Sequence, residues 1–172
     1  MTKATYLNLR FPLTLIGAKI FAHGLYPLLE RPMKELTDRV FVLEEIFPDA
    51  AELSRAMDRA GGKFEAARLF QAYLQDKYSR AAEIDPVTRE IVSKILDESG
   101  NVILKEISRL CDISPRQIER KFDRFVGISP KTLARVVRFS KCLAAIQRLS
   151  DRKTLEIIHS FGYYDQTHFI KE

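Results

Sequence analysis

The sequence has few of the features that mark secreted or membrane-embedded proteins. It contains only two cysteines, Cys111 and Cys142. They cannot form a disulfide framework, and we expect both to be reduced packing residues on buried helix faces. The apolar stretch at residues 13–21 is much shorter than the roughly 20 residues of a membrane span, and Lys19 interrupts it. No small-residue cleavage site follows an apolar core, as a secretory signal requires. These absences favour a cytoplasmic protein.

Residues arranged for catalysis or metal binding are also missing. The three histidines, His23, His159 and His168, have no partner at metal-ligand spacing. There is no glycine-rich phosphate loop and no nucleophile elbow. The pair Glu44 and Glu45 is more simply read as a solvated surface. We therefore expect no enzyme, no metal and no cofactor.

What the sequence does contain is a globular composition with unevenly spread charge. Its 172 residues are 46% apolar and include no low-complexity tract, which predicts one or two small domains with a genuine core. Residues 1–100 carry 14 Lys/Arg and 15 Asp/Glu, a net −1, whereas residues 101–172 carry 14 and 8, a net +6. The positive charge therefore belongs to the C-terminal part, where it could attract DNA phosphates.

The N-terminal half shows extended and helical patterns. Alternating apolar residues predict one or two short extended segments over residues 6–23. Residues 49–60 and 63–82 predict two helices separated by Gly61 and Gly62. The second helix carries an apolar stripe, which is either core or a dimer seam: Phe64, Ala67, Phe70, Leu74 and Tyr78. A further helix begins after Asp85 and Pro86 and ends before the break at residues 99–101.

Residues 104–126 have the spacing of a helix-turn-helix unit. After a short apolar-periodic segment and a break at residues 111–113, Ser114 is followed by Pro115 and, three positions after the serine, by Gln117. This pattern predicts a capping box, which contributes about 1 kcal/mol to helix stability.

The capped helix has two distinct faces. Ile118, Phe122 and Phe125 form one apolar stripe, which we expect to pack on the preceding helix through Ile107, Leu110 and Ile113. At 100° per residue the opposite face presents Arg116, Glu119, Arg120 and Asp123. Such a helix either keeps the surface soluble or reads bases in the major groove, and the capped turn favours the second interpretation.

A long helix and a second unit follow. Ser129 and Pro130 predict a helix over residues 130–150, about 30 Å long, close to the roughly 34 Å between successive major grooves on one side of a duplex. It could act as a spacer. Residues 154–161 then predict a short helix, residues 162–164 a turn, and Asp165 the cap of a last helix.

Three segments carry a family resemblance. They are residues 113–122 (ISPRQIERKF), 126–131 (VGISPK) and 161–170 (FGYYDQTHFI). In order and spacing they resemble the paired helix-turn-helix domain of the AraC/XylS family of bacterial transcription regulators. More weakly, residues 35–40 (ELTDRV) resemble the end of a sensor region found ahead of some such domains.

The resemblance implies a fold and a division of the chain. The fold is expected to be mainly α, with two helix-turn-helix subdomains joined by a long linker helix and preceded by a small α/β or extended-plus-helical segment. Residues 1–82 would be a partial sensor region, too short for the usual β-rich domain. Residues 83–172 would be the DNA-binding domain, with units at about 103–126 and 154–172 and the linker at about 130–150. Because family members continue beyond the position of Glu172, the second unit is expected to be truncated.

Candidate contact residues follow from the face of the first helix and, in the second, from the resemblance alone. Base contacts are expected from Arg116, Glu119, Arg120, Gln166, Thr167, Ile170 and Lys171. Phosphate contacts, which set register rather than sequence, are expected from Gln117, Lys121, Arg124, Lys131 and Arg135.

The sequence thus predicts a sequence-specific regulator that binds double-stranded DNA and reads two successive major grooves with two recognition helices. The alternative is a truncated dimerisation module with weak DNA binding. Candidate partners besides DNA are RNA polymerase and a second copy of the chain, joined through residues 63–82. No membrane is expected as a partner, RNA binding is disfavoured, and the sequence names no effector.

Overall fold

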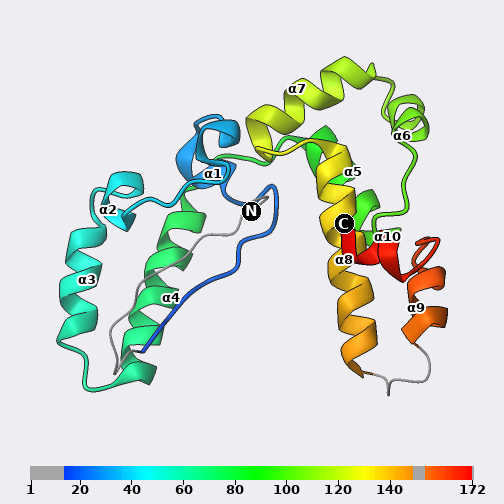
Figure 1. Cartoon of the computed structure of the whole chain (residues 1–172). Helices are drawn as coiled ribbons and strands as arrows, with labels where there is room; N and C mark the ends of the chain where they lie inside the picture. Colours follow the sequence, from blue (N-terminus) through cyan, green and yellow to red (C-terminus); the bar gives the residue numbers. More distant parts are fainter. Residues whose placement is uncertain (1–13, 149–153, 172) are drawn as a thin grey trace.

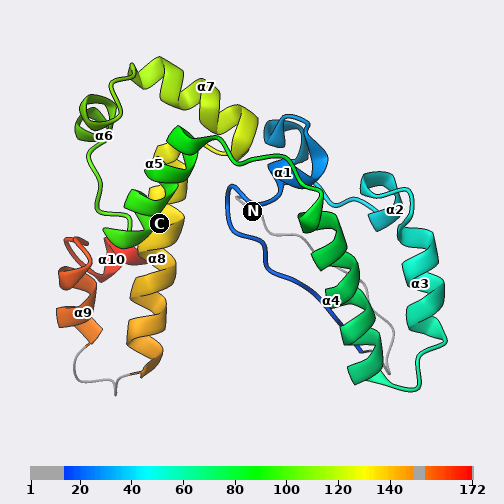
Figure 2. The same ribbon diagram turned by 180° about the vertical axis from the view of Figure 1, so that it is seen from behind.

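The computed structural model describes residues 14–148 and 154–171, and within these ranges every regular element is a helix. Figure 1 shows two groups of helices, α1 to α4 on one side and α5 to α10 on the other. The view from behind shows α1 on the side of its group that faces the other group, beside one end of α7 (Figure 2). The predicted mainly α fold class is confirmed.

The N-terminal group consists of short helices followed by an antiparallel pair. Its elements are α1 (Tyr26–Leu29), the 3-10 helix η1 (Met33–Leu36), α2 (Leu43–Ile46), α3 (Ala50–Asp58) and α4 (Lys63–Ser79). The helices predicted over residues 49–60 and 63–82 are therefore present, each slightly shorter than expected. They are separated by the glycine pair, where Gly62 has a positive φ of 155°.

The extended segments predicted for residues 6–23 fall partly outside the described residues. Residues 14–20 run along α4 without forming a strand (Figure 1). Within the described ranges there is no strand with which this segment could pair, and Leu15, one of its alternating apolar residues, is 76% exposed. Ile16 and Ala18 line a shallow apolar depression together with Ala67, Phe70 and Leu74 of α4. The middle of the α4 stripe is thus half-buried within the chain, whereas Phe64 at its start is 77% exposed.

The first helix-turn-helix lobe is built from α5 (Pro86–Asp97), α6 (Leu104–Leu110) and α7 (Pro115–Phe125). As predicted, Asp85 caps α5, and its carboxylate accepts a hydrogen bond from the backbone N–H of Thr88 at 2.8 Å. The lobe shares its core with the first half of α8 (Pro130–Arg148). That core comprises Ile91, Val92, Ile95, Ile107, Ile118, Phe122, Leu133, Ala134 and Val137.

One predicted core contact is wrong. Leu110 was expected to seat α7, but its side chain is 61% exposed. It is the last residue of α6, where the chain turns away through Cys111 and through Asp112, whose φ is +50°. Ile107 and Ile113 on either side of this turn pack against the core as expected, Ile107 fully and Ile113 partly buried.

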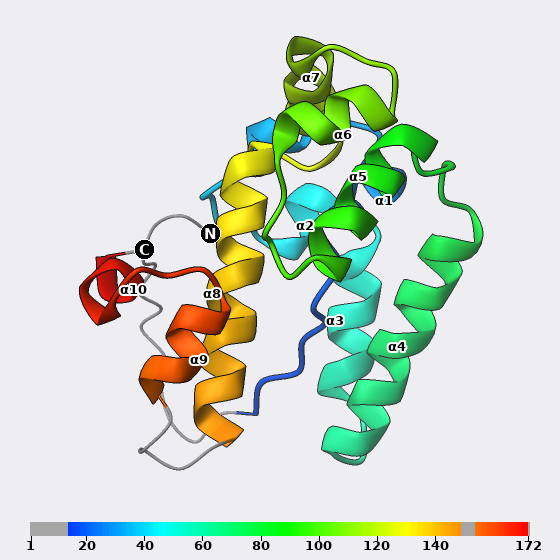
Figure 3. The ribbon, with the colours of Figure 1, turned by 90° about the vertical axis from the view of Figure 1, so that its right-hand side faces the viewer.

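The second lobe is smaller and lies against the other half of α8. It consists of α9 (Thr154–Ser160) and α10 (Gln166–Lys171). Figure 3 shows both helices on one side of α8 and α5 on the other. The fully buried side chains of this lobe are Cys142, Ile158 and Tyr163, with Phe169 packed edge-on to Tyr163 at 5.2 Å between ring centroids. Because α8 contributes residues to both cores, one 19-residue helix, about 28 Å long, joins the two lobes.

Candidate nucleic-acid interface

Helix α7 begins with the predicted capping box. The Ser114 hydroxyl accepts from the backbone N–H of Gln117 at 3.3 Å, and the Gln117 side-chain oxygen accepts from the backbone N–H of Ser114 at 2.8 Å. Pro115 occupies the first helical position, where its missing N–H costs nothing. The start of the helix is therefore fixed to one residue, which fixes the direction in which every later side chain points.

The two faces of α7 are separated as the sequence indicates. Ile118 and Phe122 are fully buried, whereas Arg116, Glu119 and Arg120 are exposed. These exposed side chains line a shallow surface depression together with Ser114, Gln117 and Asp123. Within the described part of the chain, none of the three makes a side-chain hydrogen bond or an ion pair. Two guanidinium groups with all their donors available therefore lie on the first two turns of α7.

Lys121, a predicted phosphate contact, is engaged inside the protein. Its ammonium lies 2.6 Å from Oδ1 of Asp85, so it ties α7 to the cap of α5. Burial alone would raise the pKa of Asp85, but the hydrogen bonds from Lys121 and from Thr88 outweigh burial and hold that pKa below its ordinary value. A phosphate contact by Lys121 would require this ion pair to open.

The lowered pKa of Asp85 predicts a pH dependence of stability. Because the folded-state pKa lies below that of the unfolded chain, about 4, the stabilisation is fully present above pH 4 and is lost as the pH falls through the folded value. Asp85→Asn keeps a capping side chain but removes the charge, and we expect it to lower the free energy of unfolding by about 1–2 kcal/mol at pH 7. The difference in the free energy of unfolding between this variant and wild type should become smaller below pH 4. Urea unfolding from pH 3 to 7 measures it.

The control for this measurement is Asp58→Asn, which removes a carboxylate that makes no ion pair among the described residues. It should leave the pH dependence unchanged. A deficit of the same size at pH 3 and pH 7 for Asp85→Asn would contradict the assignment.

Arg124, another predicted phosphate contact, points toward the N-terminal group. Its Nε and Nη2 atoms donate to the Tyr26 hydroxyl at 3.3 and 3.1 Å. The rings of Tyr26 and Phe125 meet edge to face, 4.6 Å apart. Phe125, predicted to pack on α6, therefore contacts Tyr26 of α1.

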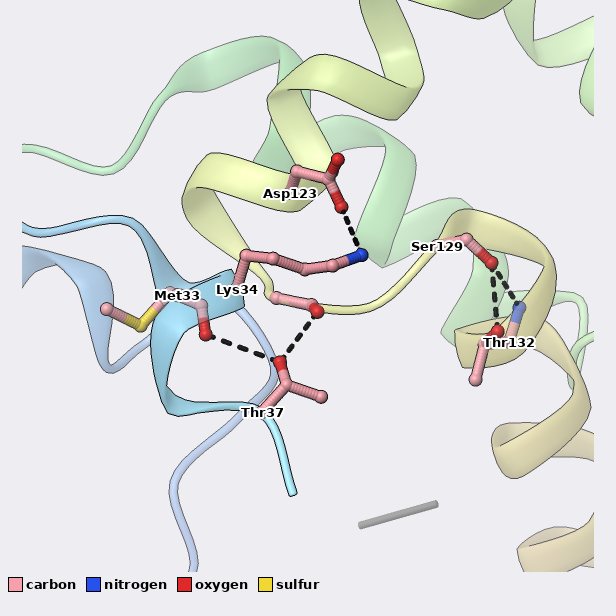
Figure 4. Close-up of polar contacts among 7 residues, drawn as sticks. Met33, Lys34, Thr37, Asp123, Ser129 and Thr132 are labelled. Carbon is pink, nitrogen blue, oxygen red and sulfur yellow. Dashed lines mark hydrogen bonds and ion pairs between the residues drawn. The ribbon is translucent and has the colours of Figure 1, made fainter. Parts of the chain in front are cut away.

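A second contact joins η1 to the C-terminal end of α7. The Lys34 ammonium lies 2.9 Å from Oδ1 of Asp123, and the Thr37 hydroxyl donates to the Gly127 carbonyl at 2.7 Å (Figure 4). Gly127 has a φ of +89°, and a Cβ there would lie 2.7 Å from the carbonyl oxygen of Met33. The sequence did not predict this contact, because its partners lie about 90 residues apart and no local pattern pairs them.

The start of α8 offers further cations. Ser129 caps it as predicted, its hydroxyl accepting from the backbone N–H of Thr132 at 3.1 Å (Figure 4). Lys131 and Arg135 are exposed on the first two turns. Lys131 makes no hydrogen bond or ion pair within the described residues, whereas Gln117 is occupied by the capping box.

The second unit places its candidate residues on α10. Gln166 and Thr167 are exposed, and Ile170 is 72% exposed. Phe169 points inward, where its ring stacks on Phe139 of α8 at 5.1 Å. The side chain of the remaining candidate, Lys171, lies outside the described residues.

The two histidines whose side chains the structure describes, His23 and His159, have separate surroundings. Burial, and then the charge of Arg89, lower the pKa of His23. The Nδ1 atom of His159 lies 3.1 Å from the carbonyl oxygen of Tyr163, which closes the turn between α9 and α10. In residues 14–148 and 154–171 no group of His, Cys, Asp and Glu side chains is placed to hold a metal ion. Over the same residues, no helix combines the length and the apolar character needed to cross a membrane.

One comparison with known proteins agrees with this architecture. No curated protein and no solved structure gives a significant match to the chain. A family model does match, over a segment that covers most of α6 and all of α7 to α10. It is not the model of an enzyme family, and it supports the AraC type of DNA-binding unit indicated by the sequence. Residues 107–172 are thus similar to the family described as a helix-turn-helix domain.

Proposed function

We propose that this protein is a transcriptional regulator that binds double-stranded DNA sequence-specifically, with α7 reading one major groove and α10 the next. The observation that carries the proposal is the state of α7. Its inner face is fully buried and its start is capped, while Arg116 and Arg120 project from the first turns with no partner among the described residues. An arginine held in this way can donate two hydrogen bonds to guanine O6 and N7.

The other side chains on the proposed reading faces suit complementary contacts. Glu119 can accept from cytosine N4, and Gln166 from α10 can bond an adenine edge. Thr167 can bond a base edge, and Ile170 can contact a thymine methyl group. Lys171 completes this proposed set. Support for two-groove reading comes from α8, whose length of about 28 Å approaches the groove repeat of about 34 Å.

The proposed phosphate contacts fall into two groups. Lys131 and Arg135 lie exposed at the start of α8, and Lys131, which makes no hydrogen bond or ion pair among the described residues, can contact phosphate directly. Gln117, Lys121 and Arg124 already make hydrogen bonds or ion pairs within the protein. These interactions would have to break before the three side chains could contact phosphate.

Selection from a randomised duplex library tests the function. We expect the wild-type chain to enrich one sequence and to bind it about a thousandfold or more tighter than random DNA at 150 mM salt. Uniform recovery of the library would contradict sequence-specific binding.

Lys131→Ala is expected to weaken binding to the selected and to random DNA by the same factor. The reason is that a phosphate contact carries charge but no sequence information. The slope of log affinity against log salt should fall in magnitude by about 0.9, the release of one counterion. Fluorescence anisotropy at four salt concentrations measures both. A loss confined to the selected site would instead place Lys131 at a base.

A second candidate function is dimerisation through residues 63–82, with weak DNA binding. It is favoured by the exposed Phe64 at the start of the α4 stripe. Sedimentation equilibrium of the wild type and of Phe64→Ser separates the two: a monomer at all concentrations removes this candidate, and a dimer lost in the variant supports it.

A further inference from the structure

An acidic residue lies on the same side of α7 as the proposed reading residues, about one turn after Arg120. On the α7 wheel Asp123 falls within the same 100° arc as Arg116, Glu119 and Arg120, and it lines the same surface depression. A carboxylate facing a duplex is repelled by the phosphates, which carry one charge per about 1.7 Å of helix axis. Left alone, Asp123 would therefore work against DNA binding by the arginines beside it.

The N-terminal group supplies the neutralising charge. Lys34 of η1 reaches Asp123 with its ammonium 2.9 Å from Oδ1 (Figure 4). The two side chains are 61% and 53% exposed, so the ion pair lies at the solvent-facing edge of α7 rather than beneath it.

Other contacts, not this ion pair, hold η1 in place. Thr37 donates to the Gly127 carbonyl at 2.7 Å, and Met33 is buried with its carbonyl against the Gly127 backbone. An exposed ion pair contributes little to folding. The position of Lys34 is therefore imposed by buried contacts, while its charge is left at the surface.

We propose that Lys34 is part of the DNA-binding surface, although it lies outside the helix-turn-helix segment: it cancels the charge of Asp123 and thereby permits α7 to approach the phosphates. This inference rests on the proposed function. It adds a residue of the N-terminal group to the interface, so that DNA affinity depends on η1 being docked on α7.

The test is a double-mutant cycle at Lys34 and Asp123. The affinity of each variant for the selected duplex is measured from 50 to 200 mM salt. We expect Lys34→Ala to weaken binding roughly three- to tenfold and to lower the salt slope by up to about 0.9, the effect of one charge. Asp123→Asn alone should bind as tightly as wild type or tighter. The double variant Lys34→Ala/Asp123→Asn should return to within about twofold of wild type, because the local charge is balanced again.

The controls separate this effect from net charge and from folding. Arg55→Ala removes one positive charge from α3, which lies away from α7 (Figure 1), and should not change affinity. Thermal unfolding of each variant should stay close to that of wild type.

Three results would overturn the proposal. They are unchanged affinity in Lys34→Ala, an equal loss in Arg55→Ala, and a double variant as weak as Lys34→Ala. The last would mean that Lys34 acts by some route other than Asp123. If the wild type binds no DNA at all, the proposed function fails as well, whereas normal wild-type binding with a silent Lys34→Ala overturns this inference alone.

Discussion

Replacing Arg120 with alanine is expected to abolish most of the preference of the protein for its selected site. One bidentate arginine–guanine contact is worth about 1–3 kcal/mol of discrimination, so the ratio of the affinities for the selected and random duplexes should fall roughly 5- to 150-fold. The affinity for random DNA should fall only about threefold, the effect of one missing charge. Anisotropy titrations of both duplexes at 100 mM salt measure the ratio.

Two variants sharpen this prediction. Arg120→Lys keeps the charge but not the planar fork of donors, so it should bind random DNA normally and still lose most of the preference. Arg55→Ala removes an equally exposed arginine from α3 and should change neither affinity. If Arg120→Ala weakens the selected and random duplexes by the same factor, Arg120 contacts phosphate and not a base.

Gly100→Ala is expected to destabilise the first lobe strongly, because the added methyl group would meet the backbone of α8. Gly100 has a φ of +80°, and its Cβ would overlap the carbonyl oxygen of Ala134 and lie 2.8 Å from the backbone N of Arg138. Both obstacles are backbone atoms of α8, which cannot rotate away. A left-handed conformation costs a non-glycine residue about 1–2 kcal/mol, and overpacking adds about 1–3 kcal/mol.

The expected result for Gly100→Ala is therefore a loss of about 2–5 kcal/mol in the free energy of unfolding, with a Tm lower by roughly 10 °C. Urea and thermal unfolding followed by circular dichroism measure it. Gly17→Ala is the matched control, since a Cβ there meets nothing within 4 Å. Equal midpoints for the two variants would show that the turn after α5 can move away from α8 at little cost.

The helices that the sequence predicted well are those that begin with a capping residue. Asp85, Ser114 and Ser129 each precede a proline and each caps the helix that follows. Such caps depend on residues one to three positions apart, so a single sequence is sufficient to find them. The exposed arginines of α7 follow from the same fixed helix start.

The sequence could not predict contacts between residues that lie far apart in the chain. Lys121 and Arg124 read as surface cations by helical position, but their partners, Asp85 and Tyr26, are 36 and 98 residues away. Leu110 read as core because its spacing fits, yet the helix ends there and the side chain turns outward. Helical periodicity assigns a face to each residue, but it does not say which distant segment covers that face.

The unequal cores of the two lobes have a consequence for the order of events on DNA. Nine side chains are buried around the first lobe, but among the described residues only three are buried in the second. Segments with few buried apolar contacts open locally at a small free-energy cost. The first lobe would therefore bind a duplex as a preformed unit, whereas α9 and α10 would lose conformational entropy on binding. In the proposed complex with DNA, part of the binding free energy of the second lobe would offset the entropy lost when α9 and α10 become ordered.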